Sequence, residues 1–194
     1  MLELNERFCT DEELSNTPII LGRTATNAAA YAHGLRLAAY EYPEAFGSGY
    51  KSFSISETKA MFLSYGYLTF GVGQDQKLQA GISIYRTPPS GAWGTSYDTP
   101  RAPSIEFLFK HKALNNLTVG RTLAATAFGY LLECGYDEVS LCVTARNTIM
   151  RKLYTRLGFR EVAYSTAQAD KVIGMKLDGR SALANAHNKL RNQL

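Results

Sequence analysis

Asn147-Thr-Ile-Met-Arg-Lys-Leu-Tyr-Thr-Arg-Leu-Gly-Phe159 carries the strongest structural signal in this chain. An apolar run over 139–143 comes just before it and predicts a buried strand. Asn147 is suited to cap the helix expected over 146–157, because an asparagine side chain accepts a hydrogen bond from the first turn. Gly158 then ends that helix, since glycine adopts the left-handed conformation of a C-cap. The stretch therefore predicts a strand–helix–strand unit.

Further strands and helices are predicted on both sides of this unit. The expected strands are 18–23, 67–72, 78–85, 104–110, 138–143, 159–165 and 171–177, and the expected helices are 24–42, 54–64, 120–134 and 146–157. Pro43 ends the first helix, because the residue before a proline avoids the helical region. Alternation along 104–110 predicts one face made of Ile105, Phe107 and Phe109, with Glu106, Leu108 and Lys110 on the other.

The quoted stretch resembles the late signature of the GNAT acetyltransferase superfamily, which reads Asn, six residues, Tyr, then Gly-Phe after an apolar strand. Residues 35–48 look like the first helix and following loop of one branch of that superfamily. The resemblance covers about residues 17–178. It implies an α/β fold with a mixed, strongly twisted central sheet flanked by helices, in the order β-α-α-β-β-β-α-β-α-β-β.

Three segments are expected from this reading. Residues 1–17 form a polar N-terminal arm, residues 18–178 the N-acyltransferase domain, and residues 179–194 a helical tail with Leu183, Ala186 and Leu190 at helical spacing. The implied activity is direct transfer of an acetyl group from acetyl-coenzyme A to a primary amine. The acceptor stays open, as a small molecule or a protein.

The resemblance also implies where acetyl-coenzyme A binds. The family's phosphate loop aligns with Asn115, Asn116, Leu117, Thr118, Val119, Gly120 and Arg121, of which Gly120 matches the pattern. A helix start binds phosphate through its unpaired backbone N–H groups and its positive dipole end. By the same resemblance, the main chain of Phe109 or Lys110 polarises the thioester carbonyl, and Asn147 contacts the pantetheine arm.

Two catalytic residues are expected. Tyr154 matches the family tyrosine near the coenzyme sulfur and would protonate the leaving thiolate. Glu106, the carboxylate of strand 104–110, is the first candidate for the general base that takes the amine proton. His111 is a second candidate, and ordered water is a third. Acceptor contacts are expected from Tyr40, Tyr42, Phe46 and the loop 87–103.

Alternative functions stay open because the phosphate loop departs from the family pattern. One is a non-catalytic binding or regulatory module with this fold. The other is an N-acyltransferase that takes a longer acyl group from acyl-coenzyme A or acyl carrier protein. Measured affinity for acetyl-coenzyme A and comparison of acyl donors would separate these functions.

Composition narrows the class of protein. The chain has 194 residues, 45% hydrophobic and 20% charged, which suits one globular domain. The net charge of +4 suits a phosphate-bearing partner, while the scattered basic residues do not indicate nucleic acid. Three irregularly spaced cysteines predict free thiols and a cytoplasmic setting. No apolar run reaches membrane-spanning length, no metal is expected, and a homodimer stays open.

Overall fold

The computed structural model describes residues 17–46, 54–63, 67–74, 77–85, 102–114, 118–165 and 171–192. The expected N-terminal arm, apart from Thr17, and the loop expected over 87–103, apart from Ala102 and Pro103, lie outside these residues. The strands are β1 (Ile19–Ile20), β2 (Tyr67–Gln74), β3 (Lys77–Tyr85), β4 (Ser104–Lys110), β5 (Glu138–Thr144), β6 (Arg160–Ser165) and β7 (Val172–Asp178). The helices are α1 (Ala25–Glu41), α2 (Pro43–Phe46), α3 (Ile55–Leu63), α4 (Val119–Glu133), α5 (Thr148–Leu157) and α6 (Arg180–Arg191).

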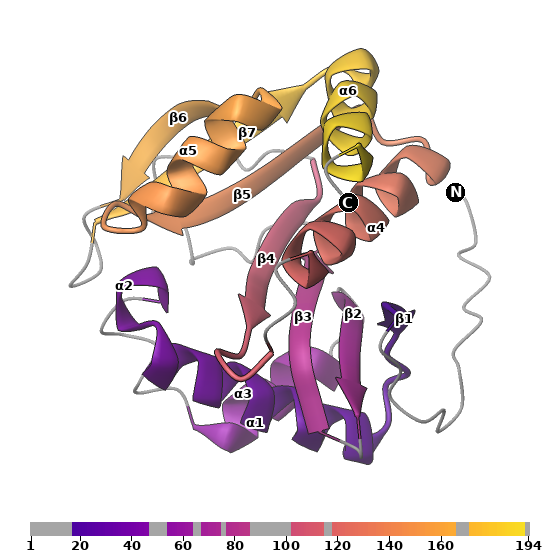
Figure 1. The fold of residues 1–194 in the computed structure, drawn as a ribbon, viewed down its shortest axis with the longest axis vertical. Coiled ribbons are helices and arrows are strands. Elements are labelled where there is room, and N and C mark those ends of the chain that lie inside the picture. Colours follow the sequence, from indigo (N-terminus) through magenta and orange to yellow (C-terminus); the bar gives the residue numbers. More distant parts are fainter. Residues whose placement is uncertain are drawn as a thin grey trace.

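The strands form one mixed sheet in the order β1-β2-β3-β4-β5-β7-β6. Strands β4 and β5 pair in parallel, and every other neighbouring pair is antiparallel. Helices α4, α5 and α6 pack over one face, while α1 and α3 cover the β2–β4 part of the other (Figure 1). The mixed, helix-flanked sheet expected from the sequence is confirmed, and so is the order of its elements, with the short α2 added.

The larger core lies between the sheet and α4, α5 and α6. It is built from apolar positions that recur at helical spacing in α4 and α6 and from inward-facing strand residues. Its fully buried members include Ile82, Leu123, Phe128, Leu131, Leu141, Met175, Leu177, Leu183 and Leu190. The helical tail expected after residue 178 therefore contributes three of its residues, Leu183, Ala186 and Leu190, to the same core.

Local sequence signals act as expected at the helix ends. The Thr24 hydroxyl accepts a hydrogen bond from the Asn27 backbone N–H at 3.1 Å and caps α1. Helix α1 ends at Glu41, before Pro43, as the proline predicts. Pro43 then starts the one-turn helix α2 in part of the expected loop, because proline is already constrained for the first helical position.

Strand β4 contains a bulge that overturns the alternation predicted for it. Phe107 has φ 53, and the register shifts so that Phe107 and Leu108 lie opposite the single residue Ile82 of β3. An extra residue in one strand reverses the facing of every residue beyond it. Ile105 therefore packs in the core under α4, while Phe109 packs in the cluster under α1. The expectation that these two side chains share a face is wrong.

The bulge coincides with the point where β4 and β5 separate. Their ladder consists of two residue pairs, Ser104 with Ser140 and Ile105 with Leu141. Both strands continue past this ladder, β4 to Lys110 and β5 to Thr144, and Figure 1 shows them diverging. Because a bulge bends its strand, β4 turns away from β5. A wedge-shaped gap, here called the β4/β5 gap, opens in the middle of the sheet.

Candidate active site

Glu106 lies at the narrow end of the β4/β5 gap, one residue past the ladder. Its Oε1 atom accepts a hydrogen bond from the Ser104 hydroxyl at 2.5 Å. Burial of the carboxyl raises its pKa to about 7, and the bond from Ser104 opposes that rise. A carboxyl with this pKa exchanges a proton near neutral pH, which is the property required of a general base.

Tyr154, carried by α5, lies within electrostatic reach of Glu106. Tyr154 is 7% exposed, and the centroid of its ring lies 5.5 Å from the centroid of the Phe159 ring. Burial raises the pKa of its hydroxyl, and the Glu106 carboxylate raises that pKa further. The hydroxyl therefore keeps its proton throughout the neutral range and can act as a hydrogen donor. The structure thus brings together the two residues that the sequence proposed as acid and base.

Cys142 of β5 joins this pair, which the sequence did not predict. Burial, with a smaller effect from the Glu106 carboxylate, raises the pKa of its thiol. The neutral thiol is a poor nucleophile, since the thiolate is the reactive form. Its position follows from the register of the short β4–β5 ladder. Nothing in the local sequence specifies a pairing between strands so far apart.

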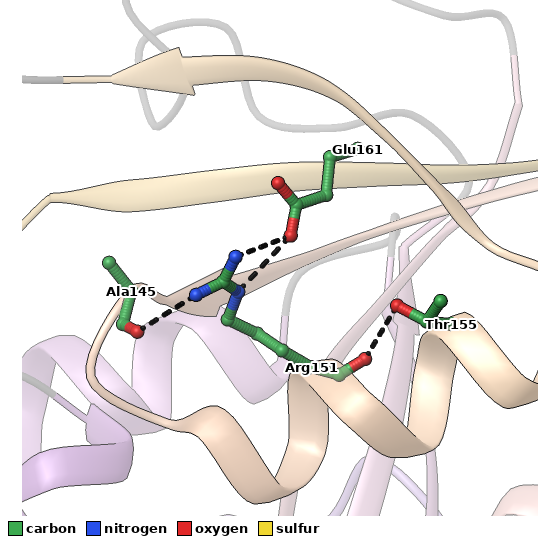
Figure 2. A network of polar contacts seen from close by, with 4 residues as sticks. All are labelled: Ala145, Arg151, Thr155 and Glu161. Atoms are coloured by element: carbon green, nitrogen blue, oxygen red, sulfur yellow. Dashed lines mark hydrogen bonds and ion pairs between the residues drawn. The ribbon is translucent and has the colours of Figure 1, made fainter.

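Hydrogen bonds at the start of helix α5 and along its side hold the helix in place. The Asn147 Oδ1 atom accepts the Met150 N–H at 3.2 Å, which confirms the expected cap. Arg151 binds Glu161 of β6 through Nε at 3.1 Å and Nη2 at 2.7 Å, and its Nη1 reaches the Ala145 carbonyl at 3.4 Å (Figure 2). These contacts fix the helix that carries Tyr154 relative to β5 and β6.

A surface hollow beside Arg151 is separate from this site. It has a volume of about 400 Å³ and is lined by Thr148, Arg151, Lys152, Thr155, Arg156 and Glu161. None of these residues is among those predicted to act in catalysis or coenzyme binding. Glu106 instead lies one residue past the β4–β5 ladder.

The start of α4 is suited to hold an anion. Its first turn carries no acidic residue, and the Thr118 side chain does not cap it. A Cβ added at Gly120 would meet nothing within 4 Å, so the approach to this turn is open. Backbone N–H groups and the helix dipole favour phosphate there. Val119 is buried and Arg121 exposed, while Asn115, Asn116 and Leu117 lie outside the described residues.

The far end of β4 leads from the gap toward that helix start. The Phe109 ring packs against Tyr31 of α1 and fits the space opposite Gly81, where a Cβ would lie 2.9 Å from it. The Lys110 Nζ atom donates to the Leu114 carbonyl at 2.7 Å and shapes the following turn. Phe109 and Lys110 both lie on the part of β4 that extends past its ladder with β5.

The wide end of the gap is bordered by α1 and α2. The Glu41 Oε2 atom lies 3.2 Å from His111 Nδ1 and accepts the Lys112 N–H at 3.0 Å. The Thr144 hydroxyl of β5 donates to the Glu44 carbonyl at 2.6 Å. These contacts tie the end of α1 to β4 and α2 to β5. His111, the second candidate base, is thereby engaged with Glu41 beyond the end of β4.

The residues proposed to contact the acceptor lie near this border. Tyr40 is 55% exposed, and the Tyr42 ring stacks beneath Lys112 Nζ at 5.2 Å from its centroid. Phe46 packs against the cluster under α1. Within the described ranges, no group of three His, Cys, Asp or Glu side chains could hold a metal ion. None of the described helices is both long and apolar enough to cross a bilayer.

Solved structures with the same fold come from several bacteria. The ribosomal-protein-S18-alanine N-acetyltransferase of Escherichia coli is 20% identical, with a TM-score of 0.57 over 84% of this chain and 94% of that one. A GCN5-related N-acetyltransferase of Kribbella flavida is 16% identical, with a TM-score of 0.61 over 84% and 98%. The yncA structure of Salmonella typhimurium, which contains its cofactor acetyl-CoA, is 15% identical, with a TM-score of 0.58 over 84% and 94%. No curated protein sequence matches significantly.

A family model settles the classification that these folds suggest. The model of the acetyltransferase (GNAT) family matches residues 36–159, which is more than half of the chain. The match runs from the last turns of α1 through β4, α4, β5 and the whole of α5, so it includes both Glu106 and Tyr154. This chain therefore belongs to the GNAT family of acetyltransferases.

Proposed function

We propose that this protein transfers an acetyl group from acetyl-coenzyme A directly to a primary amine. The observation that carries the proposal is the position of the Glu106 carboxyl, one residue past the β4–β5 ladder and within electrostatic reach of the Tyr154 hydroxyl. One group has a pKa of about 7 and the other is held protonated. Two titratable groups whose surroundings separate their pKa values are what an acid–base pair requires.

Acetyl-coenzyme A would be bound by backbone groups more than by side chains. The open first turn of α4 suits the pyrophosphate, and Asn147 at the start of α5 would contact the pantetheine arm, as the family resemblance implies. The β4 main chain at Phe109 or Lys110 would supply a hydrogen-bond donor to the carbonyl oxygen, which gains negative charge as the amine attacks. Bound acetyl-coenzyme A supplies the activated acetyl group as a thioester.

The proton transfers balance between Glu106 and Tyr154. As the amine nitrogen bonds to the acetyl carbon and the carbon–sulfur bond breaks, Glu106 accepts a proton from nitrogen. Tyr154 donates its proton to the departing sulfur. Return of the proton from Glu106 to the Tyr154 phenolate restores both groups, and it runs from the stronger acid to the stronger base because the pKa of Tyr154 lies above that of Glu106. The products are an amide and free coenzyme A.

The cysteines and the edge of the sheet bear on where this protein works and how it assembles. Cys134 and Cys142 are free thiols, which suits the reducing cytoplasm. The final strand pair leaves β6 at the edge of the sheet, and edge strands are frequent sites of pairing between chains. We therefore propose a cytoplasmic enzyme for which a homodimer is the first assembly to look for.

Calorimetric titration with acetyl-coenzyme A tests the donor site. Gly120→Asp places a negative charge at the start of α4, where it favours the helix but repels phosphate. We expect affinity to fall about tenfold, while Gly120→Ala binds like the wild type because the space there is open. Equal affinity of the aspartate variant would remove this site from the proposal.

Release of free coenzyme A in the presence of amine panels tests the reaction. The wild type should release coenzyme A in an amine-dependent manner, and Glu106→Gln should reduce this release about 100-fold or more. No release with any amine, with acetyl-coenzyme A bound tightly, would favour a binding module over an enzyme. Release from longer acyl donors alone would favour the acyltransferase alternative.

A further inference from the structure

Ser104 stands beside the proposed base in a rigid part of the sheet. It is 0% exposed, and it pairs with Tyr85 of β3 on one side and with Ser140 of β5 on the other. It therefore belongs to the β4–β5 ladder before the gap opens. A residue held by strands on both sides offers a fixed point from which to orient a neighbouring side chain.

The contact between Ser104 and Glu106 is short and directional. The serine hydroxyl lies 2.5 Å from Oε1 of Glu106, within the range of hydrogen bonds from a hydroxyl to a carboxylate. An ionised carboxylate accepts and cannot donate, so the serine is the donor. With Oε1 engaged in this way, Oε2 is the oxygen assigned to take a proton.

We infer that Ser104 is a positioning residue for Glu106, whose hydroxyl orients the carboxylate toward the β4/β5 gap and stabilises its charged form. The inference rests on the proposed function only for the use made of the carboxylate. The bond itself, and its effect on protonation, are properties of the folded chain and are measurable without an acceptor.

The other groups around Glu106 add no positive charge that would stabilise its carboxylate. Tyr154 from α5 and Cys142 from β5 both have raised pKa values, so they are neutral in the neutral range. Opposite Glu106 on β3 lies Ser83, whose hydroxyl contacts the Tyr31 hydroxyl of α1 at 3.0 Å. Burial and the bond from Ser104 are the causes that set the pKa of Glu106, and they act in opposite directions.

The experiment compares Ser104→Ala with Ser140→Ala. Ser140 is the matched control, because it pairs with Ser104 in the ladder but its hydroxyl donates to the Pro103 carbonyl. The probe is the full chain labelled with 13C at glutamate carboxyls, titrated by NMR, with Glu106→Gln used to assign the Glu106 signal. Melting curves verify that each variant is folded.

We expect Ser104→Ala to raise the pKa of Glu106 by about one pH unit above the wild-type value of about 7. Ser140→Ala should leave it unchanged. An unchanged titration in Ser104→Ala, or an equal rise in both variants, would overturn the inference.

Failure of the proposed function would look different. If Glu106→Gln keeps the amine-dependent turnover, Glu106 is not the base, whatever the titrations show. If Glu106 is the base, the acid limb of kcat/KM in Ser104→Ala should move upward with the NMR titration. Activity well below pH 7 should then fall about tenfold and recover at high pH.

Discussion

Replacement of Glu106 by glutamine should stabilise the protein in neutral and alkaline solution. The folded carboxyl has a pKa of about 7, raised from an ordinary value of 4.5 by burial. The folded protein therefore binds this proton more tightly than the unfolded chain does. The resulting stability is fully present below pH 4.5 and is lost as the pH rises to about 7.

The difference between the pKa values of Glu106 in the folded and unfolded chain sets the size of this stability change. It corresponds to about 3 kcal/mol in total, of which roughly 2.5 kcal/mol falls between pH 5 and pH 8. Glutamine keeps the shape of the side chain and carries no charge at any pH. The variant should therefore gain roughly 2.5 kcal/mol over the wild type as the pH is raised from 5 to 8.

Urea unfolding of both proteins at pH 5, 6, 7 and 8 measures this difference. Other titrating groups cancel in the comparison, because they are common to the two chains. Glu57→Gln is the matched control: Glu57 is exposed, accepts hydrogen bonds from Ser54, and has a lowered pKa, so it stays ionised above pH 5. Parallel curves for wild type and Glu106→Gln would show that the Glu106 carboxylate is well solvated, and the argument for a tuned base would fail.

Two further changes test the arrangement around α5. Tyr154→Phe should slow acetyl transfer by about 100-fold, because the proton donor for sulfur is lost. The affinity for acetyl-coenzyme A, measured by calorimetry, should stay the same. Unchanged turnover would mean that Tyr154 is not the acid. Arg151→Met should lower the free energy of unfolding by about 0.5–1 kcal/mol, because its ion pair with Glu161 is partly exposed. That loss should shrink in high salt, and a salt-independent loss would assign the effect to the bond with the Ala145 carbonyl.

Local features of the fold were accessible from the sequence because they depend on a few neighbouring residues. Asn147 caps α5 as its side chain predicts, and Gly158 ends that helix with φ 107. Strand β4 was predicted with the bounds that the structure has. The bulge at Phe107 was not, because its cause lies partly in β3, where Gly81 leaves room for the Phe109 ring.

The candidate site, like the fold, could be predicted from the sequence only in part. Tyr154 and Glu106 were each selected by position in a motif or strand, but their proximity depends on how α5 packs against the sheet. The position of Cys142 beside Glu106 could not be predicted, because it follows from the register of a two-pair ladder between distant strands. The sequence of a strand contains no periodic pattern that specifies its register with a strand so distant in the chain. The bond from Ser104 to Glu106 lies within β4, but its effect depends on burial of the carboxyl, which only the folded chain supplies.

The sequence by itself determined the family, the order of the elements and the identity of the candidate acid and base. These follow from periodicity, capping and a spaced motif, all of which are short-range. The tertiary structure decided where β4 leaves β5, which side chains meet in the resulting gap, and how strongly they are desolvated. The pKa of Glu106 belongs to this second group, because a carboxylate loses its water only when distant segments close around it.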